Sequence, residues 1–154
     1  MRHILGTLVI GACVAATAAC GSASSTATTD PNRPAPGPVT GAHVSLVSMT
    51  GGGGHMSTRA TLVSTAPQLR AFTAQFGQDA IRNQVRGAVG RAQGKGQPVY
   101  AAVVAIGCDR PPGADVSLDG QGDVVITPHD VASPLQECLA AVTTVAVASV
   151  PGAD

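Results

Sequence analysis

The chain has almost no aromatic residues with which to build an interior. Phe72, Phe76 and Tyr100 are the only aromatics among 154 residues, and tryptophan is absent. Small aliphatic residues must therefore fill the core. Binding sites for sugars and for single-stranded nucleic acid depend on aromatic stacking. The composition therefore argues against both of these functions, and we expect no nucleic-acid partner.

The first nineteen residues have the pattern of an export signal. A short basic start, residues 1–3, precedes an uncharged apolar run at 4–19. Sixteen residues of helix span about 24 Å, which is less than the ~30 Å hydrocarbon core of a bilayer. No later apolar run is longer. We therefore expect residues 1–19 to be a signal peptide rather than a membrane-spanning helix.

Cys20 follows this run directly. Its position changes the predicted fate of the protein from secretion to attachment at the membrane. The sequence TAAC at 17–20 resembles the bacterial lipobox, usually Leu-(Ala/Ser)-(Gly/Ala)-Cys, at three of its four positions, with Thr17 in place of Leu. The resemblance implies that the Cys20 thiol receives a diacylglyceryl group and that Cys20 becomes the new N-terminus. Two acyl chains give stable anchoring, where a single chain is marginal.

A second segment, IGAC at 10–13, also resembles a lipobox. Cleavage before Cys13 would shorten the apolar core of the signal and leave the apolar residues 14–19 on the mature protein, so Cys20 is the preferred site. The lipobox, the excess of Arg over Lys and the Ala/Gly/Val/Pro richness together resemble small envelope lipoproteins of actinobacteria, mycobacteria included. The resemblance implies a location on the extracytoplasmic face of the cell membrane.

Residues 20–41 follow the signal as a low-complexity stretch. Nearly all of its residues are Ser, Thr, Ala, Pro or Gly. Such a composition cannot bury enough apolar surface to offset the entropy of ordering it. We expect a disordered tether that carries the domain beyond the membrane surface.

Residues 42–154 are long enough for one domain with a single core. Runs with β-branched residues and partial alternation predict six strands: 43–50, 57–64, 99–108, 115–118, 123–127 and 142–150. The run 99–108 is the most apolar and should be a central strand. The four glycines at 51–54 suggest a flexible turn that joins the first two strands as a hairpin.

Two helices should lie between the second and third of these strands. Ser64 or Thr65 can cap the first helix, with Pro67 in its first turn, and Phe72 and Phe76 fall at helical spacing. Residues 78–93 should form the second helix. The predicted fold class is α+β, a mostly antiparallel sheet with two sequential helices packed on one face.

Cys108 and Cys138 are the only cysteines beyond the signal and the lipid site. An even pair in an exported domain predicts a disulfide. The alternatives are a redox pair or a metal site, but the two cysteines have no CxxC spacing and no histidine near either of them in sequence. We expect the disulfide to staple the irregular segment before Cys138 to the central strand.

Met49, His55 and Met56 surround the glycine run and suggest a copper site, because soft thioether ligands suit Cu(I). The alternative is a surface loop, since no Met or His motif repeats. His43 and His129 are isolated in the sequence. We therefore assign no metal and no cofactor.

Charge is balanced over the chain but not along it. Residues 59–95 hold six basic side chains against the single acid Asp79, whereas 109–154 hold seven acids against Arg110 alone. The basic residues of this stretch are Arg59, Arg70, Arg82, Arg86, Arg91 and Lys95. They form either a docking surface for an anionic lipid or wall polymer or an ordinary solvated helix face.

No catalytic signature is present. The chain has no GxSxG elbow, HExxH pair, Walker loop or Rossmann glycine pattern. The leading hypothesis is a non-enzymatic, lipid-anchored envelope protein that binds a partner protein or another envelope component. The alternatives are a carrier of an apolar ligand such as a lipid, and a copper-binding protein.

Overall fold

The computed structural model describes residues 37–152. The predicted signal peptide, Cys20 and the tether up to residue 36 lie outside the described residues. The elements follow the order β1 (Gly37–Pro38), β2 (His43–Thr50), β3 (Thr61–Leu62), α1 (Ala66–Thr73), α2 (Asp79–Gln93), β4 (Val99–Gly107), β5 (Ala114–Leu118), β6 (Val124–Pro128) and β7 (Val142–Ser149). The predicted α+β class with mostly antiparallel strands is confirmed.

The main sheet has four antiparallel strands in the order β2-β7-β4-β3. β7 and β4 are the central pair because both bury side chains on both faces, which suits their near-continuous apolar runs. The pairing contains a bulge between Val103 and Ala105. A bulge of this kind bends the strand and increases its twist.

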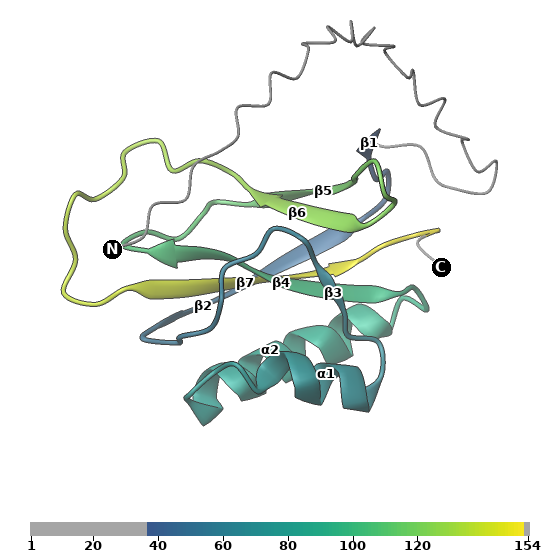
Figure 1. The fold of residues 1–154 in the computed structure, drawn as a ribbon, viewed down its shortest axis with the longest axis horizontal. Coiled ribbons are helices and arrows are strands. Elements are labelled where there is room, and N and C mark those ends of the chain that lie inside the picture. The colour runs from purple at the N-terminus through teal and green to yellow at the C-terminus, as the bar shows by residue number, and fades with distance from the viewer. Residues whose placement is uncertain (1–36, 153–154) are drawn as a thin grey trace, which may run out of the picture. The chain divides into compact units, whose positions relative to one another are not determined.

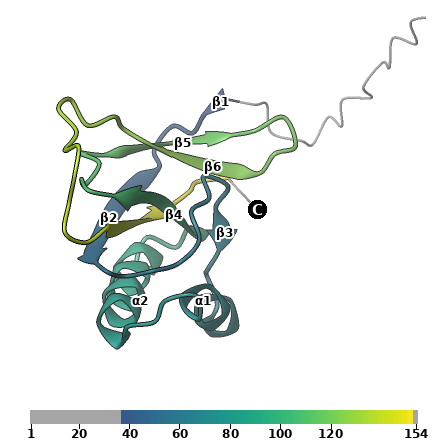
Figure 2. The ribbon, with the colours of Figure 1, turned by 60° about the vertical axis from the view of Figure 1, so that its left-hand side comes forward.

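The remaining strands form a second sheet in the order β1-β5-β6, where the sequence predicted only one sheet. The predicted hairpin of β5 and β6 is confirmed, with Leu118 paired to Val124 next to the turn. Both helices cover one face of the main sheet and the β5–β6 hairpin covers the other (Figures 1 and 2). The result is three layers.

The predicted hairpin between 43–50 and 57–64 is wrong. β2 pairs along its whole length with β7, and only Thr61 and Leu62 of the second segment form a strand, paired with β4. The physical reason is burial. β7 is apolar on both faces and belongs in the centre of the sheet, whereas the polar start of segment 57–64 can only lie at an edge.

Residues 57–62, which we call the bridging segment, join the two sheets. The N–H of Ala60 donates to the carbonyl of Val124 and the N–H of Ile126 donates to the carbonyl of Thr58, both at 2.8 Å. The next residue after Ala60, Thr61, pairs with Ala101 of β4. One short stretch of chain therefore holds an edge of each sheet.

α1 begins as its predicted capping residue indicates, whereas α2 has no side-chain cap. Thr65 accepts from the N–H of Gln68, and the Gln68 side chain accepts from the N–H of Thr65, which makes a capping box. α1 ends at Thr73, so Phe76 lies in the turn beyond the helix. It is nevertheless almost fully buried, at 1% exposure.

Two hydrophobic clusters fill the spaces between the layers. The helix-side cluster holds Phe72, Phe76 and Ile81 together with valines of β4 and β7. The hairpin-side cluster lies between the two sheets and consists of alanines and valines plus Ile126. Alternate residues of β4 and β7 supply both clusters, because successive side chains of a strand point to opposite faces.

Two segments predicted to be flexible are parts of the packed structure. Gly37 and Pro38, placed in the tether by the sequence, pair with β5, so the ordered chain begins before residue 42. The glycine run is also held in place. Thr143 donates its hydroxyl to the carbonyl of Gly53, and a Cβ on Gly52 would come within 2.7 Å of Ile81. Glycine is required there by close approach.

Candidate functional site

The two cysteines of the domain meet at one end of the main sheet. Cys108 follows β4, and Cys138 lies in the long connection between β6 and β7, with 5.3 Å between their Cα atoms. This distance is compatible with the predicted disulfide. The pairing also joins the segments that the sequence predicted it to join.

The connection 129–141 contains no helix or strand and exposes large apolar side chains. Leu135 is 61% exposed and Leu139 is fully exposed. Few hydrogen bonds hold the connection in place. The N–H of Leu135 donates to Asp109 at 2.7 Å, and the N–H of His129 donates to the carbonyl of Gly113 at 2.9 Å. Exposed apolar groups on an irregular segment are costly unless something covers them.

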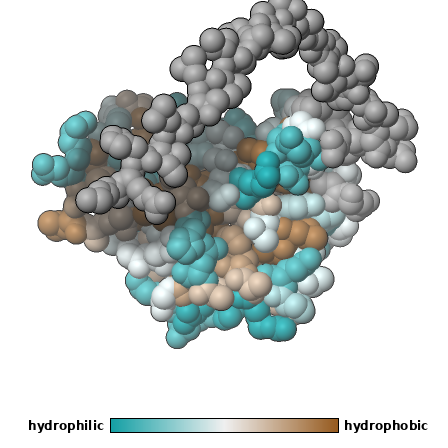
Figure 3. Space-filling view, viewed as in Figure 1, coloured by the Kyte–Doolittle hydropathy of each residue, from teal (hydrophilic) through white to brown (hydrophobic). Residues whose placement is uncertain are grey.

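An open groove of about 500 Å³ lies between this connection and the end of β4. Met56, Ile106 and Leu135 line it, and they account for three of the four large apolar side chains that stand exposed among residues 37–152. Hydrophobic surface gathers at the same end of the molecule, on the left of Figure 3. We call this feature the apolar groove.

The groove runs beside a backbone edge that is only partly paired. β3 pairs with Tyr100 and Ala101, and the N–H of Ser57 donates to the carbonyl of Val103. From Ala105 to Gly107, no residue in the described part of the chain pairs with this edge of β4. An unpaired strand edge can accept an added strand from another chain.

The rim of the groove is acidic. Asp109 and Asp130 both line it, and His129 beside them contacts Asp115 at 3.0 Å. The sequence predicted an excess of acids in this part of the chain, and the structure brings two of them to the same opening. These two side chains place negative charge at the groove.

The residues of the predicted copper site do not come together. Met49 packs against the helix-side cluster, whereas Met56 lines the apolar groove next to Val104 of the hairpin-side cluster. The N–H of His55 donates to the Gln75 side chain. Within residues 37–152 no group of three or more His, Cys, Asp or Glu side chains is arranged to hold a metal ion.

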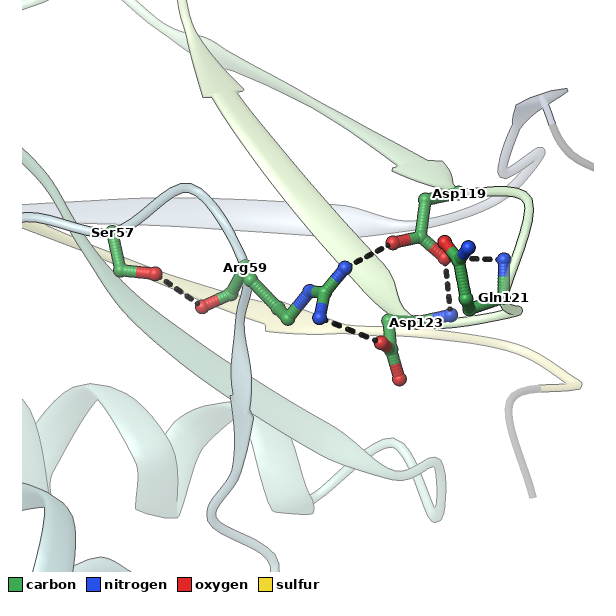
Figure 4. Close-up of polar contacts among 5 residues, drawn as sticks. All are labelled: Ser57, Arg59, Asp119, Gln121 and Asp123. Carbon is green, nitrogen blue, oxygen red and sulfur yellow. Dashed lines mark hydrogen bonds and ion pairs between the residues drawn. The ribbon is translucent and has the colours of Figure 1, made fainter. Parts of the chain in front are cut away.

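A second polar cluster fixes the bridging segment to the tip of the hairpin (Figure 4). Arg59 contacts Asp119 at 2.8 Å and Asp123 at 3.3 Å. Asp119 also accepts from the N–H groups of Gln121 and Asp123, both at 2.9 Å. We call this cluster the Arg59 clasp, and its geometry gives it a structural role.

The clasp determines the ionisation of Asp119. Partial burial is the largest single influence and favours the neutral acid, but the two backbone N–H groups and the Arg59 guanidinium together outweigh it. The pKa of Asp119 therefore lies below its ordinary value. On α2, the hydrogen bond and charge of Arg82 likewise lower the pKa of Asp79.

The groove was not predicted from the sequence, because its lining is scattered from Met56 to Leu135. One signal in the sequence could have indicated the groove. Three apolar residues lie in a segment too irregular to bury them: Val131, Leu135 and Leu139.

None of the helices among residues 37–152 is long and apolar enough to cross a membrane. In comparisons with known proteins, no family model, curated protein or solved structure matches this chain.

Proposed function

We propose that this chain is a lipid-anchored protein of the bacterial cell envelope whose domain binds a partner protein without catalysing a reaction. The TAAC sequence at 17–20 supports the anchor, through its resemblance to a lipobox. The observation that carries the binding role is the apolar groove, where three exposed large apolar side chains line one opening.

The partner that best fits the groove is an extended protein segment. Its backbone would pair with the free edge of β4 from Ala105 to Gly107, and its alternate side chains would enter the groove. Apolar residues would contact Ile106 and Leu135. Basic residues on the same segment would face Asp109 and Asp130, which gives complementary charge at the rim.

The position of the groove in the domain is consistent with an anchor at Cys20. β1, where the described chain begins, pairs with β5 next to the hairpin turn. Pro128, at the other end of the hairpin, lines the groove. The groove therefore lies at the opposite end of the hairpin from the strand with which the described chain begins.

The binding proposal is tested by crosslinking in intact cells. A photoactivatable residue at Met56 should capture a partner, and Leu135→Asp should abolish that capture by placing a charge in the apolar groove. Leu139→Asp is the matched control, because Leu139 is also exposed but does not line the groove. Both variants change exposed side chains, so both should fold.

Capture that is equal in the wild type and both variants would contradict the proposal. A lipid that co-purifies with the domain at one copy per chain, and that is lost in Leu135→Asp, would replace the protein partner with an apolar ligand. Turnover of a substrate that disappears on substitution of a single polar residue would overturn the non-enzymatic assignment.

The anchor has its own test. We expect Cys20→Ala to move the protein from the membrane fraction to the soluble fraction or to stall its processing, because no acyl chain can then be attached. Cys13→Ala is the control and should leave fractionation unchanged. A Cys20→Ala protein that stays membrane-bound and lipidated would move the anchor to Cys13 or remove it.

A further inference from the structure

A second hollow lies beneath the last two turns of α2, on the helix side of the main sheet. Its volume is about 140 Å³, roughly ten times the space that one water molecule requires. The small side chains of Ala88 and Ala92 leave this space under the helix, and Ser45 and Ser149 line it from the sheet. The hollow is distinct from the apolar groove and shares no residue with it.

Ser149, one of the residues that line the hollow, carries a buried hydroxyl group. Its residue is 0% exposed, and its Oγ atom has no hydrogen-bond partner within the described part of the chain. A buried hydroxyl without a partner costs free energy, so such a group in a folded protein requires an explanation. Ser149 pairs across the sheet with His43, the first residue of β2.

The mouth of the hollow is basic. Arg91, Lys95 and His43 line it, and none of the three is paired with a carboxylate among residues 37–152. Other basic side chains of the domain do have acidic partners: Arg59 contacts Asp119, and Arg82 contacts Asp79. The cations at this mouth are therefore available to a ligand.

This set of donors has the chemistry of a phosphate site. A guanidinium binds two phosphate oxygens at once, an ammonium adds charge, and a hydroxyl donates to a further oxygen. Among residues 37–152 the hollow is lined by basic side chains and by no carboxylate, which favours an anion over a cation. We propose that the hollow bounded by Arg91, Lys95 and Ser149 binds a phosphate group.

The phosphate has two chemical sources, a soluble phosphate and the headgroup of an anionic phospholipid. The site lies at the end of the domain where the described chain begins, since His43 follows Gly37 by six positions. The proposed phosphate site depends only on the residues of the hollow, and it does not require the apolar groove to bind a partner.

The test is a calorimetric titration of the full chain in neutral detergent, first with inorganic phosphate and then with micelles that contain phosphatidylglycerol. Arg91→Gln should weaken binding about tenfold or more, because it removes a charge-assisted contact. Arg70→Gln is the matched control, since Arg70 is exposed, has no ion pair among residues 37–152 and does not line the hollow. It should change the affinity less than twofold.

Ser149→Ala separates a binding role from a structural one. The substitution should weaken phosphate binding and leave the melting temperature unchanged or higher, because the hydroxyl has no partner to lose in the unliganded protein. A merely structural serine would instead show a lower melting temperature.

The two arms identify the source of the phosphate. Saturable binding of inorganic phosphate that Arg91→Gln weakens supports the site for a soluble phosphate. Binding seen only with phosphatidylglycerol, and equally dependent on Arg91 and Ser149, supports the lipid headgroup. No heat in either arm, or equal losses in Arg91→Gln and Arg70→Gln, would overturn the inference.

Discussion

The two faces of the main sheet are covered in different ways. The helix face carries the large side chains of the domain, including Phe72 and Phe76, whose rings meet edge to face at a centroid distance of 5.8 Å. The hairpin face carries mostly alanine and valine. Because each aromatic side chain buries far more surface than an alanine, apolar burial per residue is larger on the helix face.

The hairpin layer compensates for its smaller apolar burial with connections that do not depend on side-chain volume. The bridging segment gives backbone hydrogen bonds to β6, the Arg59 clasp fixes the hairpin turn, and the pair Cys108–Cys138 joins the far end of the layer to β4. In a domain nearly free of aromatics, one layer can thus be held on the sheet by buried side chains. The other layer can be held by backbone hydrogen bonds and a cysteine cross-link. The following predictions test that division, in order of decreasing effect.

Phe76→Ala should have the largest effect. It removes an almost fully buried aromatic from the helix-side cluster and should lower the free energy of unfolding by about 3–5 kcal/mol. Urea denaturation followed by circular dichroism measures the change. A loss below about 1 kcal/mol would show that α1 contributes little to the stability of the domain.

A matched pair of substitutions controls for the choice of side chain. Ile81→Val and Ile126→Val each remove one methylene from a fully buried isoleucine, one on each face. Each should cost about 0.5–1.5 kcal/mol. A much larger cost for Ile126→Val would show that the hairpin layer, too, is held mainly by packing.

Removal of the cysteine pair should have the second-largest effect. With a sequence separation of 30, the Cys108→Ser/Cys138→Ser variant should lose about 3–4 kcal/mol on the loop-entropy account. The same loss should follow when the wild type is unfolded in a reducing buffer. If dithiothreitol leaves the wild-type midpoint unchanged, the two thiols are not bonded in the protein.

Protonation of the Arg59 clasp should have the smallest effect. The pKa of Asp119 is lowered in the folded protein, so its contribution to stability is present above the ordinary aspartate pKa of about 3.9. The contribution is lost as the pH falls through the lower folded value. Melting temperatures of the wild type and Asp119→Asn should therefore differ at pH 7, and the difference should shrink as the pH falls below the ordinary aspartate pKa.

Asp79→Asn is a matched control for this last prediction, since the pKa of Asp79 is also lowered by an arginine. Its partner Arg82 is only three residues away on the same helix, whereas Arg59 and Asp119 are sixty positions apart. The Asp119 variant should show the larger pH-dependent difference. Equal differences would mean that the clasp contributes no more than a local helix pair.

Local signals in the sequence predicted local structure well. The boundaries of β2, β4 and β7 follow their β-branched runs to within one residue, and Thr65 caps α1 as its position before Pro67 indicates. The hairpin of β5 and β6 follows from a turn that begins at Asp119. In each case the deciding interactions lie within a few residues along the chain.

What the sequence did not predict depends on distant contacts. The partner of β2 is β7, almost a hundred positions away, and adjacency along the chain suggested residues 57–64 instead. The glycine run suggested flexibility, whereas Gly52 is fixed by the side chains of Ile81 and Thr143. The candidate sites share this property, because the hollow at Ser149 combines residues from β2, α2 and β7.

The bridging segment has a consequence for how the domain comes apart. Its backbone bonds to β6 at Thr58 and Ala60, and β3 follows directly with bonds to β4. Adjacent residues of one segment therefore hold the hairpin layer and an edge of the main sheet. The two sheets should melt as a single cooperative unit, and the amides of Ala60 and Ile126 should exchange with solvent only when the whole domain unfolds.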